Sequence, residues 1–157
     1  MLKLIKVEVK DAKKLLDVQR ICFYEYLEKY HDYSINPANK TPEQLEKTIS
    51  DESYFAYFIE YNQELAGMIC IKKISEEKCE IDIFGILPDY RNKHLGNKVI
   101  NMIFEIHNTA RIWVLGTMLQ EEKNIYFYEK IGFSRIPDAK PIEINEYLTI
   151  VRYQLIR

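Results

Sequence analysis

The stretch Ile86–Gly96 has the sequence ILPDYRNKHLG, and we expect it to anchor the chemistry of this protein. It begins as the apolar end of a strand, turns at Pro88, and carries basic residues just before an amphipathic helix begins. A strand that turns sharply into a helix leaves the first N–H groups of the helix unpaired and exposes its positive dipole end. With the charges of Arg91, Lys93 and Lys98 around it, this turn suits a phosphate-bearing ligand. An ordinary solvated turn with basic residues is the alternative interpretation.

The length and the cysteine content limit the number of domains and the kinds of cross-link that this chain can have. A chain of 157 residues with no repeat or long linker fits one domain, 1–157, which can bury a core without disulfide bonds. Cys22, Cys70 and Cys79 are too few and too scattered for a disulfide framework or a zinc site. We therefore expect no metal, and a reducing, cytoplasmic setting.

The distribution of charge narrows the class of partner. The N-terminal stretch MLKLIKVEVK alternates charged with apolar residues, whereas a signal peptide needs an unbroken apolar stretch, and no later run reaches membrane-spanning length. The net charge is -2, and Lys and Arg are spread along the chain instead of forming a basic face that could neutralise a nucleic-acid backbone. We expect neither a membrane nor a nucleic acid as the main partner.

Apolar periodicity and capping residues predict the elements. Strands are expected at 2–9, 54–61, 65–74, 79–87, 111–117, 133–136 and 147–156, and helices at about 12–30, 42–49, 97–106 and 121–131. Asp11 is a candidate N-cap, Thr41-Pro42-Glu43-Gln44 reads as a capping box, and Gly132 ends the last helix. The order βααβββαβαββ predicts an α/β (α+β) fold, a central mixed sheet with helices on both faces.

Two local patterns accompany this order. The first is RNKHLG at Arg91–Gly96, after the apolar-Pro turn, and the second is FYEKIGF at Phe127–Phe133, at a predicted helix end. Together with the element order they resemble the GNAT superfamily of acyl-CoA-dependent N-acyltransferases, over nearly the whole chain. His94 departs from the first pattern, because it stands where the family usually has glycine. At that position glycine would allow a positive φ, which histidine reaches more readily than most other residues.

The resemblance implies acetyl-CoA as cosubstrate and an N-acetyltransferase as the activity. The loop amides that would bind the pyrophosphate belong to Arg91, Asn92, Lys93, His94, Leu95, Gly96 and Asn97. The pantetheine arm would pair with backbone near Phe84, Ile86 and Leu87, where the strand splays from its neighbour. Gly85, inside this branched strand, indicates a bulge or a close backbone approach, with a packing glycine as the alternative.

The implied reaction is direct attack of an amine on the acetyl thioester, through a tetrahedral intermediate. Tyr128 matches the family tyrosine that donates a proton to the departing thiolate; a core tyrosine is the alternative. Glu80 and Asp82 lie two residues apart on one strand face, so either could accept the amine proton, unless that face is simply solvated. A covalent route through Cys79 is a further alternative, although no paired histidine can be identified.

The acceptor is less defined than the donor. Asn124, one turn before the tyrosine, is a candidate contact to the cofactor arm, although Glu121 occupies the position where the family more often has asparagine. Aromatic residues crowd the end of the first helix, where Asp32 suggests ammonium recognition. Exposed apolar residues of the final strands leave a homodimer open. A non-catalytic acyl-CoA-binding or regulatory domain, and a plain interaction domain, are the contrasting functions.

Overall fold

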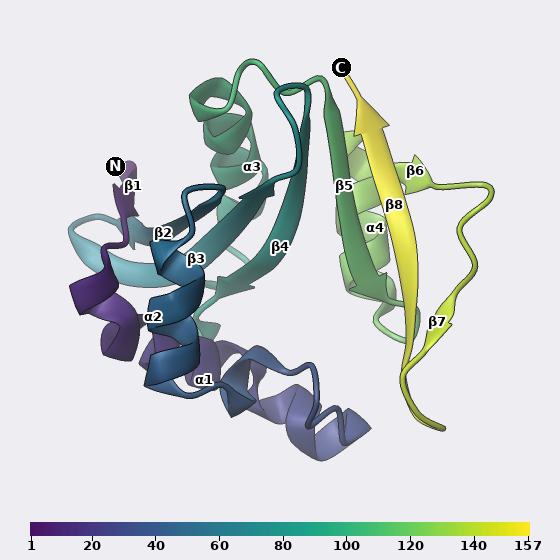
Figure 1. The fold of residues 1–157 in the computed structure, drawn as a ribbon, viewed down its shortest axis with the longest axis horizontal. Coiled ribbons are helices and arrows are strands. Elements are labelled where there is room, and N and C mark those ends of the chain that lie inside the picture. The colour runs from purple at the N-terminus through teal and green to yellow at the C-terminus, as the bar shows by residue number, and fades with distance from the viewer.

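The computed structural model describes all residues 1–157 and contains one open mixed sheet (Figure 1). Its strands are ordered β1-β2-β3-β4-β5-β8-β6, with the short β7 paired to β8. The strands are β1 Leu2–Lys6, β2 Tyr54–Tyr61, β3 Glu64–Lys73, β4 Lys78–Ile86, β5 Ile112–Met118, β6 Ser134–Arg135, β7 Ile142–Glu143 and β8 Thr149–Ile156. The α-helices are α1 Ala12–Tyr30, α2 Pro42–Ser50, α3 Leu95–Ile106 and α4 Glu122–Ile131. Short 3-10 turns lie at Val9–Asp11, Pro37–Asn39 and Pro88–Tyr90.

The predicted fold class and element order are confirmed, apart from β7, which the sequence did not reveal. Strands β1 to β4 pair antiparallel, and β4 and β5 are joined by α3 and pair in parallel. Strand β8 then inserts between β5 and β6. The hairpin turn between β2 and β3 uses only Asn62 and Gln63, both at positive φ, which is the conformation of a tight primed turn.

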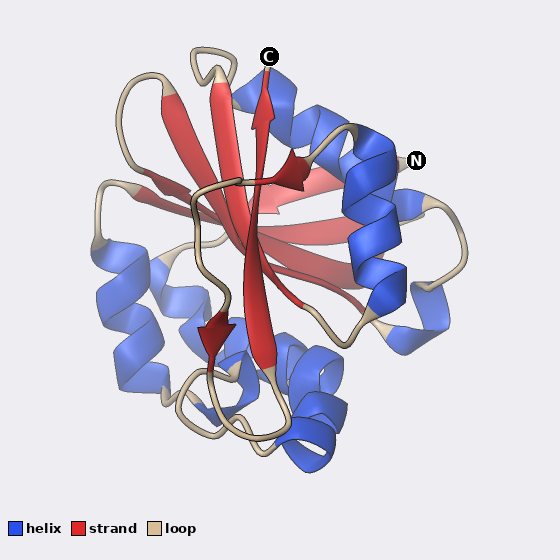
Figure 2. Ribbon diagram, turned by 90° about the vertical axis from the view of Figure 1, so that its right-hand side faces the viewer, coloured by secondary structure: helices blue, strands red, loops and turns tan.

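Helices cover both faces of the sheet, as predicted (Figure 2). On one face α3 packs Val99, Ile100 and Ile103 against the strands, in a core that includes Trp113 of β5. On the other face α1 and α2 cover a smaller core over β2 and β3. The two cores pack against β4 from both sides and so hold its C-terminal end, where the ILPDYRNKHLG stretch begins. None of the four α-helices combines the length and the hydropathy that a membrane-spanning helix requires.

Two local predictions differ from the structure. Strand β1 ends at Lys6, because Val9–Asp11 forms a 3-10 turn. Asp11 stands at the N-cap position of α1 without capping that helix; its Oδ2 accepts a bond from the Glu8 N–H instead, at 3.0 Å. The capping box at Thr41 is confirmed, since Thr41 and Gln44 bond each other's backbone N–H groups.

Candidate active site

The strands β4 and β5 diverge, which opens the sheet at its centre. Their parallel pairing runs from Lys78 with Ile112 to Ile81 with Leu115 and ends there, although both strands continue. Backbone amides alternate sides along an antiparallel strand, and Leu87 donates its N–H to Ala66 on the β3 side, at 2.8 Å. The amides of Phe84 and Ile86 therefore face the opening, where an extended ligand could pair with them.

Leu87 does not fit the role that the resemblance implied for it. Its N–H is already bonded to Ala66, so it is turned away from the opening. The carbonyl of Ile86 is also occupied, by the Arg91 Nε–H at 3.0 Å. The backbone groups left facing the opening are the N–H and C=O of Phe84 and the N–H of Ile86.

At Gly85 the side chains of α1 pack closely on β4, and no bulge occurs there. A Cβ at this position would lie 2.9 Å from the Cβ of Cys22 and 3.1 Å from the ring of Phe23, so only glycine lets α1 pack this tightly on β4. The irregularity in the strand falls earlier, at Asp82, because Ile81 and Ile83 pair with the consecutive residues Ile71 and Cys70 of β3. Gly85 is thus a packing glycine that places α1 beside the opening.

The loop after β4 is shaped as an anion-binding site. After Pro88–Tyr90, Asn92 and His94 adopt left-handed conformations, with φ of 65° and 56°. His94 is the N-cap of α3, and no side chain caps that end. The first N–H groups of the helix, at Leu95, Gly96 and Asn97, have no carbonyl within the helix to bond. Left-handed residues next to a helix start form a concave set of N–H donors that suits a phosphate.

The side chain of Arg91 holds the loop in place, a role that the sequence did not reveal. Its guanidinium donates to the carbonyls of Ile86 and Cys22 and pairs with Glu25 at 3.1 Å. The side chain therefore fastens the loop to the end of β4 and to α1. Arg91 positions the N–H groups of the loop, while Lys93 and Lys98 leave their charges without an ion-pair partner nearby.

Tyr128 lies on α4 within an aromatic group beside the opening. Its ring contacts Phe127 and Phe133 at centroid distances of 5.0 and 5.8 Å, and Phe127 lies 6.1 Å from Phe84 of β4. No protein group hydrogen-bonds its hydroxyl, and burial, with the neighbouring hydroxyl of Tyr26, raises the pKa of Tyr128 above its usual value of 10. The hydroxyl is protonated at neutral pH and free to donate.

Helix α1 supplies a polar wall opposite Tyr128. Burial and the nearby Glu121 raise the pKa of Tyr26, and Asn124 next to it acts in the opposite direction. Glu121 accepts hydrogen bonds from Tyr30 and from Lys29, the latter at 2.8 Å. The contacts tie the start of α4 to the end of α1. Asn124 faces α1 at this wall, and Glu121 bridges the two helices where the resemblance expects an asparagine.

The two candidate bases have different surroundings. Glu80 pairs with Arg152 of β8 at 2.7 Å and with Lys72 at 3.9 Å, so its charge is balanced by two cations. Asp82 is exposed and accepts a hydrogen bond from the Tyr54 hydroxyl at 2.6 Å, with no cationic partner. Glu80 is therefore held in place by its ion pairs, whereas Asp82 is open to solvent and to an approaching ammonium group. Arg152 comes from a distant strand, and nothing in the sequence pointed to it.

Two further candidates are not supported. Cys79 is buried in the core on the α3 face, and burial raises the pKa of its thiol, which disfavours the reactive thiolate. Asp32 is buried, and both of its carboxylate oxygens accept hydrogen bonds from the Asn36 Nδ2, at 3.1 and 3.2 Å. It therefore organises the loop after α1 instead of facing an acceptor. No group of three or more His, Cys, Asp or Glu side chains could hold a metal ion.

The comparisons with known proteins concern both sequence and fold. Residues 13–133 match the model of the acetyltransferase (GNAT) family. The chain is similar in structure to an acetyltransferase from Thermus thermophilus, at 19% identity and a TM-score of 0.77, over 100% of this chain and 97% of that one. It is also similar to spermidine N-acetyltransferase from Vibrio cholerae in complex with CoA and spermine, at 18% identity and a TM-score of 0.75, over 99% and 95%. A dodecameric form of the Vibrio enzyme gives 20% identity and a TM-score of 0.70, over 99% and 93%.

Proposed function

This chain belongs to the acetyltransferase (GNAT) family, and on that premise we propose that it transfers the acetyl group of acetyl-CoA to an amine. The observation that carries the proposal is the opening between β4 and β5, which leads from the Phe84 amide to the anion-binding loop at His94. The N–H groups of the loop and of the α3 start would bind the pyrophosphate. The pantetheine arm would lie along β4 and bring the thioester to Tyr128.

The chemistry follows from the groups around the opening. The amine nitrogen attacks the thioester carbonyl carbon, and the resulting oxyanion takes a hydrogen bond from a β4 amide. The carbon–sulfur bond then breaks, and the thiolate takes the Tyr128 proton. An alkyl ammonium has a pKa near 10, so it must lose a proton before it attacks, and Asp82 accepts that proton through water. As the intermediate collapses, the nitrogen loses its second proton to solvent. Tyr128 then regains a proton from solvent and Asp82 releases its own, so each turnover releases one net proton.

The difference between the two carboxylates gives a testable assignment of the base. Asp82→Asn should lower kcat/KM most at low pH, by about tenfold to a hundredfold, because the amine is then mostly protonated. Glu80→Gln should act mainly on stability, because it leaves Arg152 without its close partner. The pH profile of kcat/KM and the thermal midpoint of each variant check the assignment. A larger kinetic loss in Glu80→Gln, with the thermal midpoint unchanged, would reverse it.

His94 offers a test of how the loop binds its ligand. It holds a left-handed φ of 56°, which glycine adopts without steric cost. His94→Gly should therefore bind acetyl-CoA as well as the native chain or more tightly, since binding works through backbone N–H groups. Isothermal titration calorimetry with acetyl-CoA measures this. A tenfold or greater loss of affinity would show instead that the imidazole itself contacts the cofactor, and no binding to the native chain would favour a plain interaction domain.

The acceptor is proposed only as a class, a primary amine. A neighbour in structure is a spermidine N-acetyltransferase bound to CoA and spermine, so polyamines are the first acceptors to try. The same neighbour forms a dodecamer, and exposed Ile142, Tyr147 and Ile156 support self-association of this chain as well. The contrasting function, a non-catalytic acyl-CoA-binding domain, would bind acetyl-CoA in the same loop but would not depend on Tyr128.

A further inference from the structure

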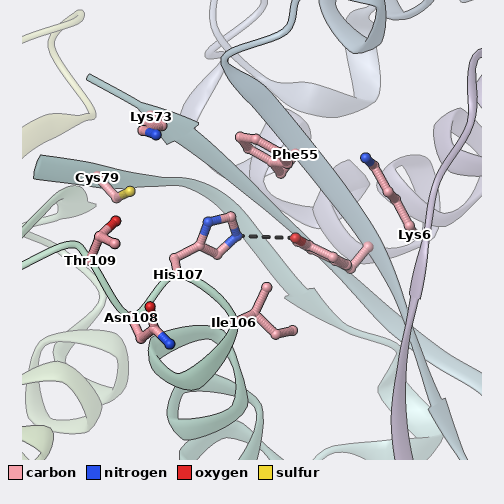
Figure 3. A pocket seen from close by; sticks show the side chains of 9 residues that line it. Lys6, Phe55, Lys73, Cys79, Ile106, His107, Asn108 and Thr109 are labelled. Atoms are coloured by element: carbon pink, nitrogen blue, oxygen red, sulfur yellow. Dashed lines mark hydrogen bonds between the residues drawn. The ribbon is translucent and has the colours of Figure 1, made fainter. Parts of the chain in front are cut away.

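A cavity lies at the far end of α3 from the anion-binding loop. Its volume is about 320 Å³, and the ends of β1, β2, β3 and β4 meet the end of α3 around it (Figure 3). It is lined by Lys6, Phe55, Tyr57, Lys73, Cys79, Ile106, His107, Asn108 and Thr109. Helix α3 has 12 residues and is about 18 Å long, so the cavity is separate from the loop at its start. Its volume falls in the lower range of sites for small molecules.

The charged groups of this cavity are both cations, and its other polar groups can donate hydrogen bonds. Two ammonium groups, of Lys6 and Lys73, lie at its rim with the amide of Asn108 and the hydroxyl of Thr109, and no Asp or Glu lines it. Lys6 makes no ion pair, and its Nζ lies 5.5 Å from the centroid of the Phe55 ring. A cavity with this charge attracts anions and repels amines.

His107 adds a neutral ring to the wall. Its Nε2 and the hydroxyl of Tyr57 are 3.0 Å apart, and its ring meets Phe55 edge to face at 5.0 Å. Burial, with the nearby Lys73, lowers the pKa of His107, so the ring is neutral at neutral pH. The Cys79 thiol is neutral as well, because burial raises its pKa. The two groups therefore do not form a thiolate–imidazolium pair, and the cavity is suited to binding rather than to nucleophilic chemistry.

Two electrostatic effects oppose the binding of an anion here, and both are small. The C-terminal end of α3 carries about half a negative charge, which two ammonium groups outweigh. Lys73 also pairs with Glu76 at 2.9 Å, but Glu76 is highly exposed, and exposed ion pairs contribute little stability. A ligand can therefore displace Glu76 from Lys73. Phe55 and the half-exposed Ile106 offer an apolar surface next to the charges.

We propose that this cavity is a binding site for a small organic oxyanion, a carboxylate or a phosphate, whose apolar part lies against Phe55 and Ile106. The ammonium groups of Lys6 and Lys73 attract the negative group. The site does not depend on acetyl-CoA, because the cavity shares no residue with the loop or with the opening between β4 and β5. The enzyme would then bind a small-molecule ligand in this cavity in addition to acetyl-CoA and the amine.

The experiment is a titration followed by ¹H–¹⁵N correlation spectra, with coenzyme A present in excess so that the loop is already occupied. The probes are phenyl phosphate, benzoate and inorganic phosphate. Saturating shifts are expected at Lys6, Lys73 and His107–Thr109, with at least one aromatic probe binding more tightly than inorganic phosphate, since its ring packs on Phe55. Tighter binding of benzoate identifies the ligand as a carboxylate, and tighter binding of phenyl phosphate identifies a phosphate.

Variants separate this site from general attraction of anions. Lys6→Gln combined with Lys73→Gln should weaken the better aromatic probe about tenfold or more, and Ile106→Glu should do so too by placing a negative charge at the rim. Lys47→Gln, an exposed change on α2 that lowers the net charge by one as Ile106→Glu does, should leave the affinity unchanged. Shifts confined to the anion-binding loop, equal losses in all variants, or no saturable shift at the cavity would overturn the proposal. Because the shifts are read residue by residue, this result stands even if coenzyme A does not bind.

Discussion

Tyr128→Phe should lower kcat by about 10²–10⁴-fold and leave the affinity for acetyl-CoA nearly unchanged. The change removes one hydroxyl that bonds no protein group, so the ring keeps its contacts with Phe127 and Phe133. The thiolate must then leave without a proton from the enzyme. Steady-state kinetics of thiol release, with calorimetry of acetyl-CoA binding, measure the two effects separately.

The pH dependence of the native enzyme adds a check on the same residue. Burial raises the pKa of Tyr128, so this residue keeps its proton to a higher pH than an exposed tyrosine does. Its role as donor should therefore not be lost as the pH rises toward 10.

Tyr126→Phe is the matched control for Tyr128→Phe, because this tyrosine lies on the same helix and is 66% exposed. Equal turnover in Tyr128→Phe and the native chain would remove Tyr128 as the proton donor.

Gly96→Ala should lower both the stability and the turnover of the protein. A Cβ on Gly96 would lie 2.7 Å from Cε1 of Phe127, and that ring is held between Phe84 and Tyr128. Overpacking of this kind costs about 1–3 kcal/mol, which exceeds the helix propensity that alanine gains over glycine, at most about 1 kcal/mol. We expect a thermal midpoint lower by about 2–8 °C and a fall in kcat of about tenfold, because displacing Phe127 moves Tyr128.

A control on the same helix isolates the clash from the change of residue. Asn101→Ala, at an exposed position of α3, should leave both the thermal midpoint and kcat near the native values. Differential scanning calorimetry and steady-state kinetics of the two variants provide the comparison. A Gly96→Ala variant that is as stable as the native chain, or more stable, would mean that Phe127 can move away without consequence and that its packing does not position Tyr128.

Local patterns in the sequence predicted most of the fold. Thr41 and Gln44 form the capping box that their spacing predicts, and Gly132 ends α4 at a positive φ. These features succeed because each depends on residues only a few positions apart. The two-residue strand β7 and the turn at Pro37–Asn39 were missed, because elements this short carry no periodic signal.

The candidate site was predictable only where it is made of contiguous residues. The loop at His94 was identified, together with the conformation that its glycine-like position requires. The partner of Glu80 is Arg152, 72 residues away, and the partners of Glu121 lie on α1, 91 and 92 residues away. Contacts of this kind are set by strand insertion and helix packing, which no local pattern encodes. Leu87 is a different case, because backbone amides alternate along a strand and the adjacent residues Ile86 and Leu87 could not both face the opening.

The most direct test of acetyl transfer to an amine measures thiol release from acetyl-CoA across a panel of primary amines that includes spermidine and spermine. Mass spectrometry of the same mixtures identifies the product. We expect at least one amine to give free coenzyme A and the N-acetyl amine in equal amounts, and we expect this turnover to be lost in Tyr128→Phe. Tight binding of acetyl-CoA with no thiol release for any amine would contradict it and favour a non-catalytic acyl-CoA-binding domain.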